Sequence, residues 1–207
     1  MSHPPDAFSA IVADLQRTQR GKRTQFLPAL ALAAITVIGT LVTVSIRPDL
    51  LTQPPAQLAM QGLLWVLCLV VMPAIGVGLV FPSGRTRVVL AIVAVATAIA
   101  ATTGFPFAPH VSGQAEMDRC VSVVIVAGAV LLGIGFLSGA FVQRRRMTAV
   151  FWVSAGMSLA SLNLVTWHCP QSGLMHVLPS HVGGAVIMLG AAVLVGVLAH
   201  RRSRSEQ

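Results

Sequence analysis

Six long stretches of this chain contain no aspartate, glutamate, lysine or arginine and consist almost entirely of apolar residues. A helix needs about 20 mostly apolar residues, at about 1.5 Å each, to cross the hydrocarbon core of a bilayer. The pattern therefore predicts an all-α polytopic membrane protein, a bundle of six transmembrane helices. The predicted spans are residues 26–46, 58–81, 88–107, 120–142, 148–167 and 180–199.

The composition supports this prediction, because only 10% of the residues are charged and 55% are hydrophobic. A soluble domain carries about 25% charged residues, so this chain could not cover a globular surface with polar groups. Gly104 and Pro106 interrupt the outer end of the third stretch. The first stretch is too long for a secretory signal peptide, and no small-residue cleavage site follows it cleanly.

The basic residues predict the orientation, since lysines and arginines in short loops are retained in the cytoplasm. With the N-terminus inside, twelve of the fourteen lysines and arginines lie on the inner side, and only Arg47 and Arg119 lie outside. We therefore expect a bacterial inner-membrane protein with both termini in the cytoplasm. Its predicted parts are a cytoplasmic N-terminal tail (1–25), a transmembrane domain (26–199) and a basic cytoplasmic C-terminal tail (200–207).

The net charge of +8 does not indicate nucleic-acid binding. The inner basic residues are divided among four short segments at the ends of spans, where anionic lipid head groups attract them. We expect the lipid bilayer to be a partner of this chain and expect no direct contact with nucleic acid.

The stretch TWHCPQSGLMHVLPSH, residues 166–181, joins the fifth and sixth predicted spans on the outer side and contains Cys169. Cys120 opens the fourth span at a similar depth. Three interpretations of this pair remain open: a disulfide, two thiols that respond to oxidants or soft metals, or two small buried hydrophobic residues. Cys68, near the middle of the second span, is expected to be an inert packing residue.

The same stretch contributes His168, His176 and His181 as candidate metal ligands, because imidazole beside thiolate suits zinc or copper. The spacing does not match a structural zinc pattern such as paired CxxC. His176 and His181 are five residues apart, which places them on different sides of a continuous helix, and Pro179 argues against such a helix. The alternative is that these histidines bond water, head groups or helix-end carbonyls. We predict no resident cofactor, and a transition-metal ion remains a candidate signal.

Motifs of catalysis are absent from the sequence. It contains no CxxC redox pair, no HExxH, no GxSxG and no pair of carboxylates within a span. We therefore expect that the protein is not an enzyme.

The N-terminal tail has apolar residues at helical spacing. Phe8, Ile11, Val12 and Leu15 fall at i, i+3, i+4 and i+7, which predicts one apolar face of a short amphipathic helix that Gly21 could end. A helix this short is marginal in water. It needs a surface, and the membrane and a groove on a partner protein are both possible.

The HCP tripeptide at residues 168–170 resembles the HCP motif of NrsF-type membrane anti-sigma factors, including its place at the outer end of the fifth of six spans. In that family a cysteine opens the fourth span, as Cys120 does here. An Asp-Leu pair ends the segment before the first span, as Asp14 and Leu15 do here. The arrangement is also similar to that of carotenoid-controlling anti-sigma proteins that respond to light and singlet oxygen. The loop after CP departs from the acidic and aromatic stretch of typical members.

The resemblance implies a negative regulator of an extracytoplasmic-function (ECF) sigma factor, with outward cysteines that take part in sensing envelope stress. The signal would be a metal, an oxidant or light-generated singlet oxygen. The sensing candidates are Cys120, Cys169, His168, His176 and His181, and the candidates for binding the sigma factor are Phe8, Ile11, Val12, Asp14 and Leu15.

The alternative function is a small membrane transporter or channel for a metal or small solute, with histidines and cysteines lining its outer mouth. Transport paths usually display ionisable groups within the membrane. The predicted spans have no Asp, Glu, Lys or Arg, which argues against this alternative.

Overall fold

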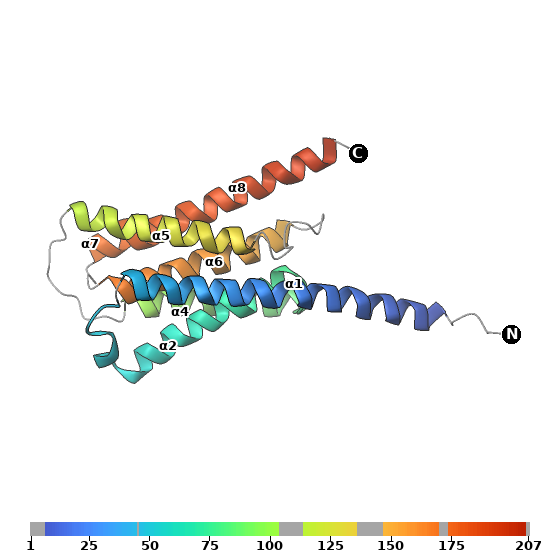
Figure 1. Cartoon of the computed structure of the whole chain (residues 1–207), viewed down its shortest axis with the longest axis horizontal. Coiled ribbons are helices and arrows are strands. Elements are labelled where there is room, and N and C mark those ends of the chain that lie inside the picture. The colour runs from blue at the N-terminus through green and yellow to red at the C-terminus, as the bar shows by residue number, and fades with distance from the viewer. Residues whose placement is uncertain (1–6, 45, 104–113, 136–146, 170–173, 206–207) are drawn as a thin grey trace.

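The structure, a computed structural model, describes residues 7–44, 46–103, 114–135, 147–169 and 174–205. Within these residues the chain is helical and contains no β-strand, and six helical segments are long and apolar enough to cross a membrane. The predicted all-α, six-span fold is therefore confirmed. Figure 1 shows the helices running along one common direction, with the two termini at the same end.

Each predicted span overlaps one of the long helical segments, but the second ends at Gly76, five residues before its predicted end. Residue 45 of the first predicted span, residues 104–107 of the third and residues 136–142 of the fourth lie outside the described residues. The elements are α1 (Ala7–Val44), the 3₁₀ turn η1 (Leu50–Thr52), α2 (Pro55–Val66), η2 (Leu67–Val71), α3 (Met72–Gly76), α4 (Gly84–Thr103), α5 (Gln114–Gly135), α6 (Met147–His168), α7 (Leu174–His176), η4 (Val177–Val182) and α8 (Gly183–Ser205).

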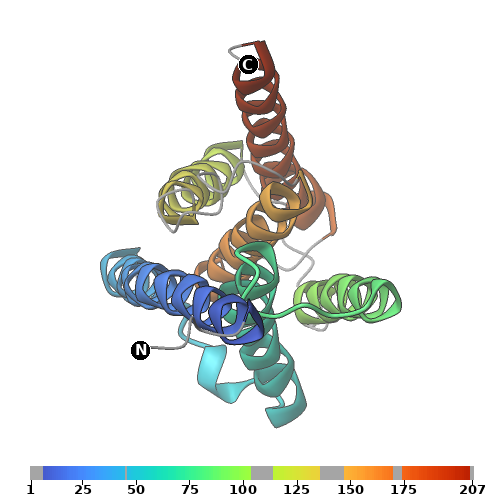
Figure 2. The same ribbon diagram turned by 90° about the vertical axis from the view of Figure 1, so that its right-hand side faces the viewer.

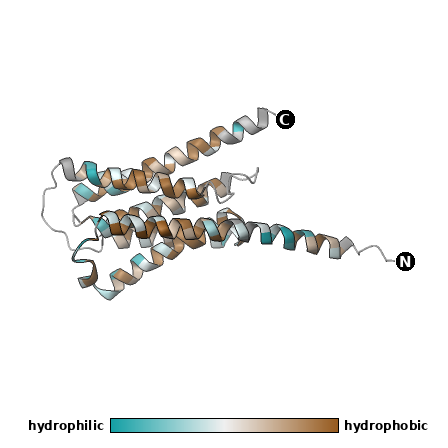
Figure 3. Ribbon diagram, in the orientation of Figure 1, coloured by the Kyte–Doolittle hydropathy of each residue, from teal (hydrophilic) through white to brown (hydrophobic). Residues whose placement is uncertain are grey.

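α1 is longer than predicted, because the N-terminal tail and the first span form one continuous helix of 38 residues. The expectation that Gly21 ends a separate tail helix is wrong. One glycine within a helix costs only about 1 kcal/mol, and a helix anchored by its membrane segment needs no new nucleus. At about 1.5 Å per residue, α1 is roughly 57 Å long. Its hydrophilic N-terminal part projects beyond the other helices (Figures 1 and 3).

α6 lies at the centre of the bundle, with the other spans around it (Figure 2). Of its span, 83% is buried, against at most 44% in any other. Its serines at 154, 158 and 161 are buried and give α6 a small, weakly polar packing face. At Gly156, an added Cβ would lie 2.6 Å from the carbonyl oxygen of Cys68. Such small residues allow helix backbones to approach closely in lipid.

Two spans remain helical past a proline by forming a wider π turn. η2 lies directly before the turn that contains Pro73, and η4 contains Pro179. Proline lacks an N–H donor and clashes with the carbonyl four residues earlier in a regular α-helix. A π turn, with hydrogen bonds from i to i+5, accommodates this change locally. The expectation that Pro179 interrupts the helix is therefore wrong.

Candidate metal centre

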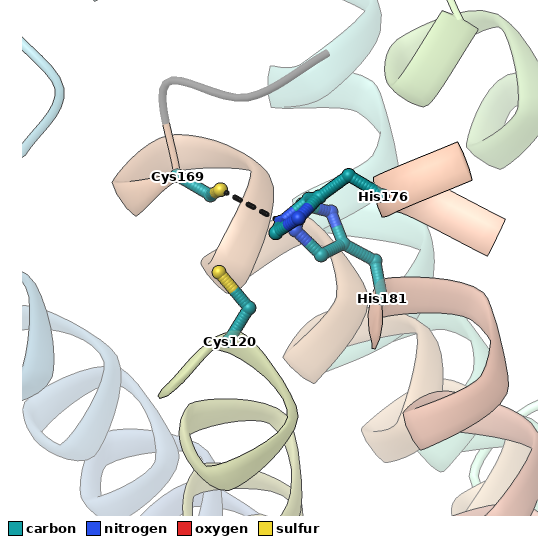
Figure 4. A group of neighbouring side chains, drawn as sticks. All are labelled: Cys120, Cys169, His176 and His181. Carbon is teal, nitrogen blue, oxygen red and sulfur yellow. Dashed lines mark hydrogen bonds between the residues drawn. The ribbon is translucent and has the colours of Figure 1, made fainter. Parts of the chain in front are cut away.

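Four side chains, one at position 120 and three between positions 169 and 181, meet at the end of the bundle opposite the two termini. Cys120 lies near the start of α5, Cys169 directly follows α6, His176 ends α7 and His181 lies in η4. All four are buried, and one ligand atom of each lies within 4.8 Å of those of the others. We call this set the Cys/His group. Figure 4 shows its sulfur atoms and imidazole rings gathered around one small region.

The π turn explains why the two histidines are together. In a regular α-helix, side chains five residues apart point in directions that differ by about 140°. In a π turn the residues at i and i+5 are hydrogen-bond neighbours, so they lie on one side. The rings of His176 and His181 are 5.2 Å apart, centre to centre, and nearly perpendicular at 84°. The prediction that they lie on different sides of a helix is wrong for this reason.

The two cysteines pack in one apolar cluster with Val124 and Val165. The backbone N–H of Cys169 donates to the carbonyl of Val165 at 2.8 Å, so Cys169 continues the last turn of α6. Both cysteines are thiols in this structure. Both cysteines are buried.

Gly184 brings the histidine-bearing helix close to α5. A Cβ added at Gly184 would lie 2.9 Å from Cγ1 of Val124. Val124 is one helical turn after Cys120, and Gly184 is three residues after His181. This contact therefore sets the distance between the cysteine on α5 and the histidines.

The distances and donor types of the Cys/His group fit a tetrahedral transition-metal ion. Two sulfur and two nitrogen donors favour zinc. With Zn–S bonds of about 2.3 Å and Zn–N bonds of about 2.0 Å, a sulfur and a nitrogen ligand lie about 3.5 Å apart. Sγ of Cys169 lies 3.3 Å from Nε2 of His176. Small side-chain movements would bring the other pairs from at most 4.8 Å to the same separation.

The histidine nitrogens give a second, independent reason to place an ion here. Both ring nitrogens of His181 and Nδ1 of His176 are buried and lack a hydrogen-bond partner among the described residues. Leaving a buried polar atom unpaired costs about 1–3 kcal/mol. A bound ion would give the His181 ring a partner that the protein itself does not provide.

Arg47 holds the end of α6 that carries Cys169. Its backbone N–H donates to the carbonyl of Trp167 at 3.0 Å, and Nη1 donates to the carbonyl of Cys169 at 3.2 Å. Cations are favoured beside the last carbonyls of a helix. In the sequence, Arg47 stands out only as one of the two basic residues predicted to lie outside. Nothing in the spacing indicates a contact between residues 122 positions apart.

Asp49 fixes the Arg47 guanidinium from the other side. Nε and Nη2 of Arg47 each donate to a different Asp49 carboxylate oxygen at 2.6 Å. The hydrogen bond from Arg47 lowers the pKa of Asp49 below its usual value of 3.8, assisted by the Arg47 charge and opposed by partial burial. The pair therefore stays ionised at neutral pH.

The remaining predicted residues lie elsewhere. His168 is half-buried at the end of α6 and does not belong to the Cys/His group. In the projecting part of α1, Asp14 is exposed and Val12 half-buried. The side chains of Phe8, Ile11 and Leu15 are 72, 58 and 59% exposed.

In comparisons with known proteins, no family model, no curated protein and no solved structure matches the chain.

Proposed function

We propose that the chain is a membrane anti-sigma factor, which holds an ECF sigma factor at the inner membrane and releases it when the Cys/His group binds a transition-metal ion. The supporting observation is that the Cys/His group and the exposed N-terminal part of α1 lie at opposite ends of one bundle (Figure 1). A protein that binds its signal on one side of a membrane and its partner on the other needs this arrangement. The resemblance of residues 168–170 to the HCP motif suggests the class of partner.

Phe8, Ile11 and Leu15 form the proposed sigma-binding face, beside Val12 and Asp14. The three large side chains are more than half exposed, at the spacing of one helix face. An amphipathic helix of this kind binds by laying its apolar side chains into a groove on a partner. Because α1 is already helical, binding would cost less ordering entropy than the folding of a disordered tail.

The ion would be held by Cys120, Cys169, His176 and His181. It would cross-link α5, the end of α6 and η4. Metal ions bind thiolates and neutral imidazoles, so two thiol protons would be released on binding. Two thiolates balance the charge of a divalent ion and leave the buried group neutral. A monovalent ion would leave one negative charge buried, at considerable cost. The Cys/His group therefore favours a divalent ion such as Zn²⁺.

The energy of metal binding is large enough for such a switch. A ligand shifts an equilibrium only by its difference in affinity for the two states. Moving a partner from 99% bound to 99% released requires about 5.5 kcal/mol. Four-ligand zinc sites bind with about 10–16 kcal/mol. A preference for the released state of about half the binding free energy is therefore sufficient.

Retention of sigma factors by the full chain in membranes tests the partner half of this proposal. Wild-type membranes should retain an ECF sigma factor, and Leu15→Glu should lose it, because a charge would enter the apolar groove. Gln16→Glu, at the next exposed position, is the matched control and should retain it. Failure of the wild-type chain to retain any sigma factor contradicts the anti-sigma proposal.

A second candidate function, transport, is supported by buried polar side chains along the bundle. The side-chain amide of Gln61, Oδ1 of Asn163 and the hydroxyls of Ser154 and Ser158 lack hydrogen-bond partners among the described residues. Buried polar residues within spans often line substrate paths. Reconstituted protein in liposomes separates the two functions. Time-dependent Zn²⁺ uptake would support transport, whereas saturable binding without flux supports a sensor.

A further inference from the structure

We propose that Arg47 is a positioning residue of the metal centre and mechanically connects it to α1. This inference rests on the proposed function, because it assigns the regulation of the same site. Arg47 lies three residues after the end of α1. Its side chain donates a hydrogen bond to the carbonyl of Cys169, which is one of the proposed metal ligands. One residue therefore joins the outer end of the partner-binding helix to the Cys/His group.

The hydrogen bonds of Arg47 fix the backbone on both sides of His168. The carbonyl of Trp167 accepts from the Arg47 backbone at 3.0 Å, and the carbonyl of Cys169 accepts from its guanidinium at 3.2 Å. The N–H of Cys169 is bonded back to Val165. Both backbone polar groups of Cys169 are thus occupied, so the backbone that carries its side chain cannot move far without moving Arg47.

The guanidinium itself is held rigidly. Its bidentate pair with Asp49 has two 2.6 Å contacts, and the side-chain amide of Gln53 donates to Asp49 at 3.1 and 3.3 Å. Arg47 and Gln53 are both buried. A bidentate pair adds geometric specificity to its energy. A lysine at position 47 could not reproduce it, because an ammonium group lacks the planar, forked arrangement of guanidinium N–H donors. This network ties the carbonyl of Cys169 to the chain that follows α1.

α1 can carry a displacement from this network to the other side of the bundle. The helix is continuous from Val44 to Ala7, and Phe26, Ala33 and Val37 pack its buried side against the core. Closing the Cys/His group from at most 4.8 Å to ligand separations of about 3.5 Å requires a movement of about 1 Å. Helix shifts of about 1–2 Å are typical of signalling transitions.

Metal titration of the full chain in lipid nanodiscs tests the positioning role. We expect Arg47→Gln to weaken Zn²⁺ affinity about 10–100-fold, the range found for residues that orient a metal ligand from outside the first shell. Arg47→Lys should also weaken Zn²⁺ affinity, because lysine keeps the positive charge but cannot make the bidentate hydrogen bonds. Arg119→Gln, which removes the other outward charge next to Cys120, should leave the affinity unchanged.

Hydrogen exchange of residues 7–25 tests the connection to α1. Saturating Zn²⁺ should change the exchange of this segment in the wild-type chain and in Arg119→Gln, but not in Arg47→Gln. The absorption bands of Co²⁺ bound to thiolate confirm that each variant is loaded. Asp49→Asn, which leaves Arg47 in place, should reduce the response partially and serves if Arg47→Gln does not fold.

The outcomes separate the inference from the function on which it rests. A wild-type chain that binds neither Co²⁺ nor Zn²⁺ overturns the metal centre and the inference together. A loaded Arg47→Gln chain with wild-type affinity and a wild-type exchange response overturns the positioning role alone. In that case, loss of sigma-factor retention in Leu15→Glu would still support the anti-sigma function.

Discussion

Sγ of Cys169, directly after α6, lies 3.3 Å from Nε2 of His176, the last residue of α7. Metal ions bind the thiolate and the neutral imidazole, so this pair becomes two ligands when the thiol loses its proton. Cys120 and His181 complete the Cys/His group (Figure 4). Cys120, on α5, is therefore brought to three residues that lie close together in the sequence, between positions 169 and 181.

Serine substitutions test the two cysteine ligands. Cys120→Ser and Cys169→Ser should each reduce Co²⁺ and Zn²⁺ affinity by more than the 10–100-fold typical of residues outside the first shell, because a hydroxyl is a poor substitute for thiolate. The thiolate-to-cobalt absorption should weaken in both. Cys68→Ser, buried within η2 away from the Cys/His group, is the control. Equal effects in all three variants would contradict the site.

Glutamine substitutions test the histidines in the same way. His181→Gln should lower Zn²⁺ affinity strongly, since it removes a ligand whose two ring nitrogens lack a hydrogen-bond partner among the described residues. It should not greatly reduce thermal stability in the metal-free state, because no described hydrogen bond to the ring is lost. His168→Gln, outside the Cys/His group, should bind Zn²⁺ like the wild type. Isothermal titration of both variants checks this, and equal affinities would exclude His181 as a ligand.

The approach of α8 to α5 is tested at two glycines of one helix. Gly184→Val would place its Cβ 2.9 Å from Val124, and overpacking of this kind costs about 1–3 kcal/mol. We expect lower thermal stability and weaker Zn²⁺ binding, since Cys120 and His181 would be forced apart. At Gly190 a Cβ meets nothing within 4 Å, so Gly190→Val should change neither. A loss of Zn²⁺ affinity in both variants would indicate a general effect on the helix.

The six spans could be predicted because lipid imposes a simple requirement of length and apolarity on each of them. The continuous α1 could not be predicted in this way. Gly21 has a weak local preference against helix, and the anchored membrane segment outweighs it.

The Cys/His group was only partly predictable. The sequence indicated that Cys120 and Cys169 share a depth, and that two of the nearby histidines follow in the same stretch. It could not show that the π turn at Pro179 brings His176 and His181 to one side, because helical spacing rules assume 3.6 residues per turn. Arg47 was missed because its partners at the end of α6 are distant in sequence.

Asp49 makes the stability of the Arg47–Asp49 pair depend on pH at strongly acidic values. The hydrogen bond from Arg47 lowers the pKa of Asp49 in the folded chain below 3.8. A carboxyl group whose pKa is lower in the folded than in the unfolded chain stabilises the fold at pH values above its unfolded pKa. This contribution is lost as the pH falls through the folded pKa. The wild-type chain should therefore be more thermally stable than Asp49→Asn at neutral pH. The difference should be small, because the Asp49 side chain is 45% exposed.

This difference should persist on mild acidification and disappear only when the pH falls below 3.8 and through the lowered folded pKa of Asp49, so that Asp49 is protonated in both states. Zn²⁺ affinity should behave differently, because its ligands must lose protons and it weakens as soon as the medium is acidified. Melting curves of the metal-free wild-type and Asp49→Asn chains across this range, beside Zn²⁺ titrations, separate the two effects. A stability difference that stays constant down to the lowest pH would show that the Asp49 charge does not hold Arg47 in place.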